Sequence, residues 1–278
     1  MERLFVPGTL EAALERLDRD RLAQPIAGGV GVLLARALGE PTPARWVAVG
    51  RLAELRELRP DVASAGVVLG AATTLDELAR GPSQLIPALL AASARSVASP
   101  GVRVVATLGG NIVAGRGRSD LAAALLALDA EVELAGPAGN RRLPLETWLA
   151  GELGSPPGGD WPVLRAVRLP ARPVGWGWRR LTVRGAMDRS VASVAVAVGP
   201  AGRRVAVSCA ADRPFRIRSA EAEAVSDADE LARAVERDLE SVALTDDERA
   251  SADYRRRVLP VLVARALAEA LTRDRPGP

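Results

Sequence analysis

The chain has 278 residues, of which 48% are hydrophobic and 26% charged, so it is long enough for two domains or one large one. Its basic residues are all arginine and nearly balance the acidic residues, and aromatic residues are few. This composition excludes a nucleic-acid-binding surface of clustered basic residues and stacking aromatic side chains. One cysteine and no histidine exclude internal disulfides, an iron–sulfur cluster held by this chain alone, and histidine chemistry. Any chemistry would therefore come from a bound cofactor or from carboxylates.

The chain carries no signal for a membrane or for secretion. No apolar run reaches the roughly 20 residues of a membrane helix. The segment from Met1 to Phe5 lacks the apolar core of a secretion signal. We therefore expect a cytoplasmic protein without a membrane span.

The first third predicts short strands, helices and one glycine turn. Thr9 is the expected N-cap of a helix, residues 25–27 and 45–49 are expected strands, and 33–38 an expected helix. Such a strand–glycine turn–helix unit presents backbone N–H groups and a helix dipole to a phosphate. It is not a Rossmann fingerprint, because a third small residue is missing at the required spacing. The turn and the start of its helix comprise Ala27, Gly28, Gly29, Val30, Gly31, Val32 and Leu33.

A second glycine turn lies in the segment 105–121. Paired glycines allow either a plain tight turn or an anion-binding concavity of backbone N–H groups, and the turn alone does not decide between them. Its candidate residues are Thr107, Gly109, Gly110 and Asn111, and Asp120 begins an expected helix that ends at Leu128. Around it we expect strands at 67–71, 131–135, 141–145 and 164–169, a capping box from Thr74 to Glu77, a helix at 86–97, a hairpin turn at 136–140 and a surface loop at 154–162.

Pro170 to Gly175 form the expected boundary to a C-terminal domain. Strands are expected at 176–183, 191–198 and 204–209, followed by helices at 227–242 and 246–271. We expect Arg255, Arg256 and Arg257 to form a solvated face of the last helix. The remaining expectations are a buried Cys209, a surface pair of Arg184 and Asp188, one core-facing side of the strand with Trp176 and Trp178, and a packed Tyr254.

Several motifs in one order resemble the FAD-binding medium subunit of molybdenum hydroxylases, the xanthine dehydrogenase and carbon monoxide dehydrogenase family. The resemblance runs from Phe5 to Leu271. Its motifs are Ala27-Gly28-Gly29, Ala98-Ser99-Pro100-Gly101-Val102-Arg103, Ala106-Thr107-Leu108-Gly109-Gly110-Asn111-Ile112, Ser119-Asp120-Leu121, Val167-Arg168-Leu169-Pro170, Arg180, Ala186-Met187-Asp188, Ser193-Val194-Ala195-Val196-Ala197 and Ala252-Asp253-Tyr254-Arg255-Arg256.

The resemblance implies an α+β fold. A vanillyl-alcohol-oxidase-like FAD-binding domain of two lobes would occupy residues 1–172, and a small α+β C-terminal domain residues 173–278. The pyrophosphate of FAD would bind the backbone of Ala27 to Leu33 and of Thr107 to Asn111. Asp120 would accept hydrogen bonds from the flavin or its ribityl chain. Arg180 stands where the family often has a lysine near the cofactor.

The resemblance also implies partners and a reaction class. Such a subunit takes electrons from a 2Fe-2S small subunit, which received them from a molybdopterin large subunit, and passes them through FAD to NAD, a quinone or oxygen. The expected assembly is a hetero-oligomer, and no catalytic side chain or metal ligand is expected in this chain. Val30 and Gly31 replace the polar residues usual in the first loop. The alternative is therefore a structural subunit of the same complex that has weakened or lost FAD binding.

Overall fold

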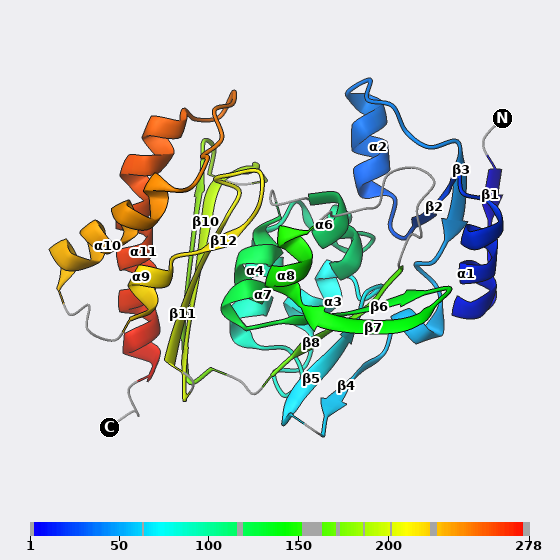
Figure 1. Ribbon diagram of the computed structural model, residues 1–278, viewed down its shortest axis with the longest axis horizontal. Helices are drawn as coiled ribbons and strands as arrows, with labels where there is room; N and C mark the ends of the chain where they lie inside the picture. Colours follow the sequence, from blue (N-terminus) through cyan, green and yellow to red (C-terminus); the bar gives the residue numbers. More distant parts are fainter. Residues whose placement is uncertain are drawn as a thin grey trace.

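The computed structural model describes residues 3–62, 64–115, 119–151, 163–170, 173–185, 187–200, 202–222 and 227–274. Three sheets follow one another along the long axis of the molecule (Figure 1). The expected loop at 154–162 and residues 171 and 172 of the expected boundary lie outside the described residues. The predicted division after residue 172 falls between the last strand of the second sheet and the first strand of the third.

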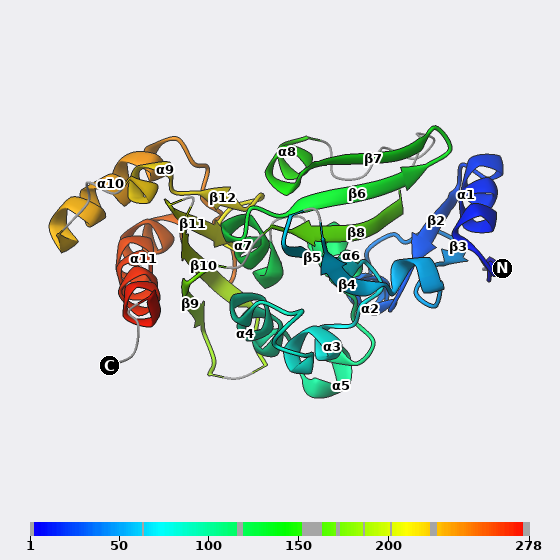
Figure 2. The same ribbon diagram turned by 90° about the horizontal axis from the view of Figure 1, so that it is seen from below.

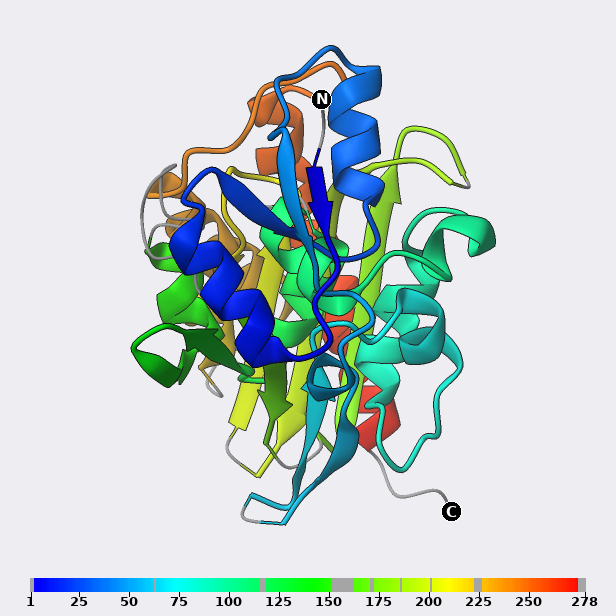
Figure 3. The same ribbon diagram turned by 90° about the vertical axis from the view of Figure 1, so that its right-hand side faces the viewer.

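A three-stranded parallel sheet begins the chain. Its order is β1 (Arg3–Phe5), β3 (Arg45–Ala48), β2 (Ala23–Ile26). Helix α1 (Leu10–Arg19) packs on β2 and β3, and Thr9 caps it as predicted by accepting a 3.2 Å hydrogen bond from Ala12 N–H. Helix α2 (Val30–Ala37) lies on the other side of the strands in Figure 3 and contains no buried residue.

A five-stranded antiparallel sheet follows, in the order β4-β5-β8-β6-β7. The hairpin β6–β7 and the strands β5 and β8 occur where the sequence predicts them, whereas β4 was missed. The capping box of Thr74 and Glu77 is present at the start of α3. The elements of this part are η1 (Ala53–Leu55), β4 (Leu58–Asp61), β5 (Gly66–Gly70), α3 (Leu75–Arg80), α4 (Ala88–Ser96), α5 (Pro100–Arg103), α6 (Leu108–Gly115), α7 (Asp120–Ala127), β6 (Glu131–Gly136), β7 (Gly139–Pro144), α8 (Leu145–Ala150) and β8 (Val163–Leu169).

The C-terminal part is a four-stranded antiparallel sheet, β12-β11-β10-β9, covered on one face by helices. Helix α7 packs against β10 and β11 on the opposite face, so it lies between this sheet and the preceding part of the chain (Figures 1 and 2). All eight residues of α7 are buried. The elements are β9 (Gly175–Thr182), β10 (Ser190–Gly199), β11 (Gly202–Ser208), β12 (Phe215–Arg216), α9 (Arg218–Glu221), α10 (Ala228–Glu240) and α11 (Ala252–Asp274).

The two faces of this sheet face different cores because side chains alternate along a strand. Val194 and Val196 of β10 pack with Leu259 and Val263 of α11. The intervening Ala195, like Ala197, belongs to the core that contains α7. Trp176 and Trp178 of β9 pack on that same core, so the expectation that one side of this strand faces the core is confirmed.

The arginine run at 255–257 corrects one expectation. Arg256 and Arg257 are exposed, but Arg255 is fully buried, so its assignment to a solvated face was wrong. Its guanidinium donates to Asp247 Oδ1 at 2.8 Å, to the Val191 carbonyl at 3.1 Å, to the Ala250 carbonyl at 2.5 Å and to the Thr245 carbonyl. Arg255 thus joins β10 to the turn before α11, which begins at Ala252 rather than at the expected residue 246.

Three further expectations concern Tyr254, Cys209 and the pair of Arg184 and Asp188. Tyr254 is 42% exposed, which corrects its expected packing. Cys209 is buried as predicted, and burial, followed by the charge of Asp120, raises the pKa of its thiol well above the usual value. Asp188 accepts the backbone N–H of Arg184 at 2.9 Å and lies 4.0 Å from its guanidinium, so the expected local pair is present.

Candidate functional site

The first predicted loop forms the N-terminus of α2. Gly29 adopts the left-handed conformation, with φ of 71°, at the N-cap position, and no side chain caps the helix. The helix begins at Val30 instead of the expected Leu33, so Val30, Gly31 and Val32 form its first turn. N–H groups of a first turn have no acceptor within the helix. The site therefore offers outward-directed N–H donors at the positive end of a helix dipole, which is an arrangement suited to phosphate.

The second predicted loop is the start of a helix rather than a turn. Helix α6 begins at Leu108, and neither Gly109 nor Gly110 has a positive φ, so positive φ is not the reason for glycine there. A Cβ on Gly109 would lie 2.9 Å from the Cβ of Ala71, which shows that close packing requires this glycine. Thr107 and Gly109 are buried, whereas Gly110 is exposed and Asn111 half-buried.

The N-terminus of α6 already has acceptors inside the protein. Four N–H groups are bonded, from Leu108 to Thr73 O at 2.8 Å, from Gly109 to Ala71 O at 2.8 Å, from Gly110 to Thr107 Oγ1 at 3.1 Å and from Asn111 to Thr107 O at 2.8 Å. The Asn111 side chain accepts a 2.5 Å hydrogen bond from Ser119 Oγ at its Oδ1 atom, which leaves its amide N–H groups as donors. At this loop the side chain of Asn111 is thus more available to a ligand than the backbone.

The two predicted loops are in direct contact. An ideal Cβ on Gly28 would lie 1.8 Å from the carbonyl oxygen of Val105, and a Cβ on Gly31 would lie 3.1 Å from the Cβ of Ala114. Only a glycine at position 28 permits this approach of the two backbones. The segments at 27–33 and 105–114, which are far apart in the sequence, therefore form one site.

Apolar side chains surround this junction without being covered. Leu33 is 65% exposed, Val104 53%, Val105 48% and Val113 38%. Exposed side chains of this size on α2, on α6 and in the turn before α6 are a surface that an apolar ring can cover. The uncapped helix, the glycine contact and these side chains together fit a nucleotide cofactor with a pyrophosphate.

Asp120 and Arg180 lie together beside the C-terminal sheet. Asp120 is the first residue of α7, with Ser119 at the N-cap position, and its side chain is buried against β10. Its Oδ1 accepts hydrogen bonds from Ser190 Oγ at 2.6 Å, from Ser193 Oγ, and from Cys209 Sγ at 3.7 Å. Arg180 of β9 places its Nε 3.6 Å from Asp120 Oδ2. The structure thus brings these two predicted residues into one buried cluster.

The two serines were missed as site residues. Ser190 and Ser193 are three positions apart, and a regular strand would place them on opposite faces. A register shift between Ser190 and Ala192 places an irregularity at Val191, which allows both hydroxyl groups to reach Asp120. Two polar residues in an otherwise apolar strand were the available signal.

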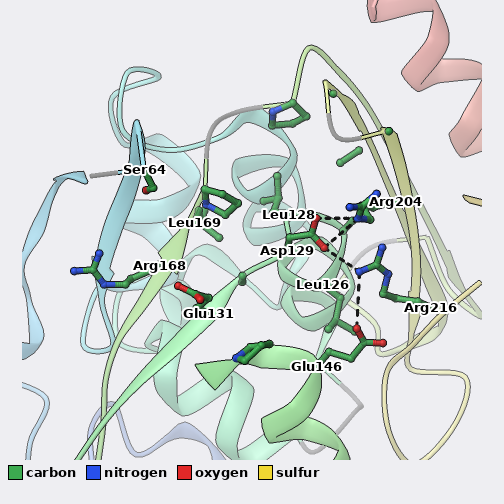
Figure 4. A pocket seen from close by; sticks show the side chains of 18 of the residues that line it. Ser64, Leu126, Leu128, Asp129, Glu131, Glu146, Arg168, Leu169, Arg204 and Arg216 are labelled. Atoms are coloured by element: carbon green, nitrogen blue, oxygen red, sulfur yellow. Dashed lines mark hydrogen bonds and ion pairs between the residues drawn. The ribbon is translucent and has the colours of Figure 1, made fainter. Parts of the chain in front are cut away.

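A separate groove lies at the far end of α7. It has a volume of about 740 Å³ and contains none of the predicted site residues. Asp129 accepts hydrogen bonds there from Arg204 at 2.8 Å and Arg216 at 2.9 Å, and Arg216 also lies 3.8 Å from Glu146 (Figure 4). Its charged side chains thus pair with one another across the junction between α7 and the C-terminal sheet.

Within the described ranges, no cluster of cysteine, aspartate or glutamate side chains could hold a metal ion. None of the helices in these ranges has the length and apolar character needed to cross a membrane. The chemistry that remains at the α2–α6 junction and at Asp120 is that of hydrogen-bonding groups that bind and orient a ligand.

Comparison with known proteins gives the family. Residues 1–172 match the FAD binding domain in molybdopterin dehydrogenase. The chain is 31% identical over 277 residues to the xanthine dehydrogenase FAD-binding subunit of Escherichia coli O157:H7, covering 95% of this chain and 94% of that one. It is 28% identical over 280 residues to the nicotine 6-hydroxylase medium subunit of Paenarthrobacter nicotinovorans, covering 96% of each.

A solved structure agrees with these relatives. A chain of the carbon monoxide dehydrogenase from Hydrogenophaga pseudoflava has a TM-score of 0.87 and 27% identity, and 98% of each chain is covered. Because the family match spans more than half of this chain and the relatives match over nearly all of it, the chain belongs to the family of FAD-binding domains in molybdopterin dehydrogenases, as an FAD-binding medium subunit of these oxidoreductases.

Proposed function

We propose that the chain binds FAD at the junction of α2 and α6 and carries electrons in a molybdenum hydroxylase. The observation that carries this proposal is the uncapped N-terminus of α2, held against Val105 by the contact at Gly28. In this reading residues 1–172 form the two lobes of a vanillyl-alcohol-oxidase-like domain, and residues 173–278 a C-terminal domain.

The pyrophosphate of FAD would bind mainly at the first loop. The free N–H groups of the first turn of α2 supply donors at Val30, Gly31 and Val32, with the segment from Ala27 to Gly29 beside them. On α6 the side-chain amide of Asn111 would complete the site beside the exposed Gly110, which has no side chain to block the ligand, while the buried Thr107 and Gly109 fix the position of that helix.

The flavin end would extend toward Asp120 and Arg180. Asp120 supplies an acceptor, and Arg180 a permanently charged donor, beside the C-terminal sheet. Bound FAD would supply the electron-transfer chemistry, and these side chains would orient it. Val30 and Gly31 leave this function intact, because the donors at this position are backbone N–H groups.

The electrons would arrive from a 2Fe-2S small subunit, after oxidation of a substrate at a molybdopterin large subunit, and leave from the flavin to an external acceptor. A hetero-oligomer in the cytoplasm would contain all three chains. This assignment agrees with the single cysteine of this chain, which cannot hold a cluster alone.

Flavin titration of the full-length chain tests the proposal. FAD is expected to bind and to shift the visible flavin spectrum, and FMN, which lacks the second phosphate and the adenosine, is expected to bind more weakly. The native complex should release FAD on denaturation and contain iron and molybdenum. A chain that takes up no FAD, alone or with its partner subunits, would be the structural subunit of the alternative reading.

A further inference from the structure

A serine hydroxyl separates the two charges of the Asp120–Arg180 pair. Ser190 Oγ accepts a 2.6 Å hydrogen bond from Arg180 Nε and donates one of 2.6 Å to Asp120 Oδ1. Arg180 Nε itself lies 3.6 Å from Asp120 Oδ2. Direct arginine–carboxylate hydrogen bonds are shorter, about 2.7–2.9 Å, and are frequently bidentate. The two charges are thus neighbours that are held apart.

Each partner keeps one hydrogen-bonding atom unused. Asp120 Oδ1 accepts hydrogen bonds from the side chains of Ser190, Ser193 and Cys209. Within the described residues, no hydrogen bond reaches Asp120 Oδ2. Arg180 donates one hydrogen bond from Nε to Ser190 Oγ and one from Nη2 to the Asp188 carbonyl. Its Nη1 donates no hydrogen bond to any described residue.

Burial makes these unused atoms informative. The side chain of Asp120 is 10% exposed and that of Arg180 13% exposed. Although the two side chains are largely buried, Asp120 Oδ2 and Arg180 Nη1 are not among the fully buried atoms of the described residues, so a ligand or water can reach and satisfy them. An acceptor and a cationic donor side by side match the alternating acceptors, N–H group and hydroxyls of a flavin and its ribityl chain.

We propose that Ser190 is a positioning residue for flavin binding: its hydroxyl keeps Asp120 and Arg180 from closing into a direct ion pair, so that Asp120 Oδ2 and Arg180 Nη1 remain available to the cofactor. Ser193 supports this arrangement by donating a second hydrogen bond to Asp120 Oδ1, which holds that oxygen in place. The inference rests on the proposed FAD site and adds a residue that acts through Asp120 and Arg180 rather than by touching FAD.

Two substitutions at one position separate positioning from general packing. Ser190→Ala removes the hydroxyl, and the direct Asp120–Arg180 pair then forms. Ser190→Thr keeps a hydroxyl in a strand that favours β-branched residues. Ser208→Ala is the matched control, because Ser208 is a fully buried serine on the adjacent strand β11 and has no hydrogen bond to Asp120 or Arg180.

The full-length chain is titrated with FAD, and the midpoint potential of the bound flavin is measured. Ser190→Ala is expected to weaken FAD binding roughly tenfold, the size of one hydrogen bond to a charged group, and to lower the potential because a cation is withdrawn from the flavin. Ser190→Thr should restore both values, and Ser208→Ala should leave both unchanged.

Two results overturn the inference in different ways. If the wild-type chain binds FAD and Ser190→Ala matches Ser208→Ala in affinity and potential, Ser190 has no positioning role although the proposed function stands. If the wild-type chain binds no FAD with its partners present, the proposed function fails, and this inference fails with it. Thermal unfolding of each variant shows whether lost affinity reflects lost folding.

Discussion

Gly28 lies against the backbone of Val105 so closely that a Cβ on Gly28 would be 1.8 Å from the Val105 carbonyl oxygen. This contact joins the loop before α2 to the segment before α6, which lies more than 70 residues later in the chain. No rotamer change can relieve such a clash, because both sides are backbone. The relative position of the two halves of the proposed FAD site therefore depends on the absence of one side chain.

Gly28→Ala is expected to separate the two segments and to reduce FAD affinity by at least tenfold. The forced shift should also destabilise the protein by about 1–3 kcal/mol, as overpacking does. Gly8→Ala is the matched control, because a Cβ there would meet nothing within 4 Å. FAD titration and thermal unfolding measure both effects, and equal FAD affinity of the two variants would contradict the close contact.

The donors of α2 can be tested without removing a side chain that contacts the ligand. Val30 is the first residue of the helix, and its N–H has no intrahelical acceptor. Val30→Pro deletes this N–H and also shifts the turn, because Gly29 before it has a ψ of −4° that a proline ring does not allow. FAD affinity of Val30→Pro should therefore fall at least tenfold, while Val30→Ala should stay within about twofold. Equal affinity of the two variants, both folded by circular dichroism, would mean that this N–H does not bind the cofactor.

Much of the regular structure could be predicted because local signals were strong. The caps at Thr9 and Thr74 have the residue types that accept N–H groups, and β10 is a run of small apolar residues that is buried on both faces. Paired glycines instead predicted a turn where α6 begins. That error arose because the acceptors that stabilise the start of α6 belong to Ala71 and Thr73, which are distant in the sequence.

The site was predicted only in part for a related reason. The family motifs identified Asp120 and Arg180, but not the serine between them. Ser190 and Ser193 reach one carboxylate only because of the irregularity at Val191, and that irregularity follows from strand pairing. Arg255 was assigned to solvent from its charge, although its spacing from Leu259 and Leu262 places it on the buried face of α11. Its acceptors lie on other segments, which a single-sequence pattern does not identify.

The buried hydrogen bonds of Arg255 lead to a prediction for the free energy of unfolding. Arg255→Met removes a donor from three carbonyl groups and the Arg255 ion pair from the partly buried Asp247, which keeps its hydrogen bonds from Arg249 and Ala250, so the free energy of unfolding should fall by about 3 kcal/mol. Arg256→Met is the control, because the Arg256 side chain is 46% exposed, and it should change the value by less than about 0.5 kcal/mol. Urea unfolding compares the two, and a small effect of Arg255→Met would show that the buried network is not a major source of stability.

Asp247 makes a prediction for acid stability. Burial raises the pKa of this carboxyl, but the hydrogen bonds from Arg255 and from the backbone of Arg249 and Ala250 lower it, and the net pKa lies below its ordinary 3.8. A carboxyl with a lower pKa in the folded state stabilises the fold above its unfolded pKa, and this contribution is lost as the pH falls through the folded pKa. Urea unfolding at several pH values should therefore show a steeper loss of stability below about pH 4 in the wild type than in Asp247→Asn.

The control for this loss of stability at low pH is Asp253→Asn, because the side chain of Asp253 is 86% exposed. This variant should follow the wild-type dependence on pH, and the difference between wild type and Asp247→Asn should be constant above about pH 5, where the carboxyl is ionised in both states. Identical slopes of wild type and Asp247→Asn below pH 4 would contradict the lowered pKa.

A crystal structure of the full-length chain with FAD tests the central claim most directly, because it locates the pyrophosphate. We expect phosphate oxygens within about 2.7–3.2 Å of backbone nitrogens in the first turn of α2, with the flavin end beside Asp120 and Arg180. FAD bound away from α2, for example in the groove beside Asp129 and Arg216, would contradict the proposed site, as would crystals grown with FAD at concentrations well above those of the titration that contain none.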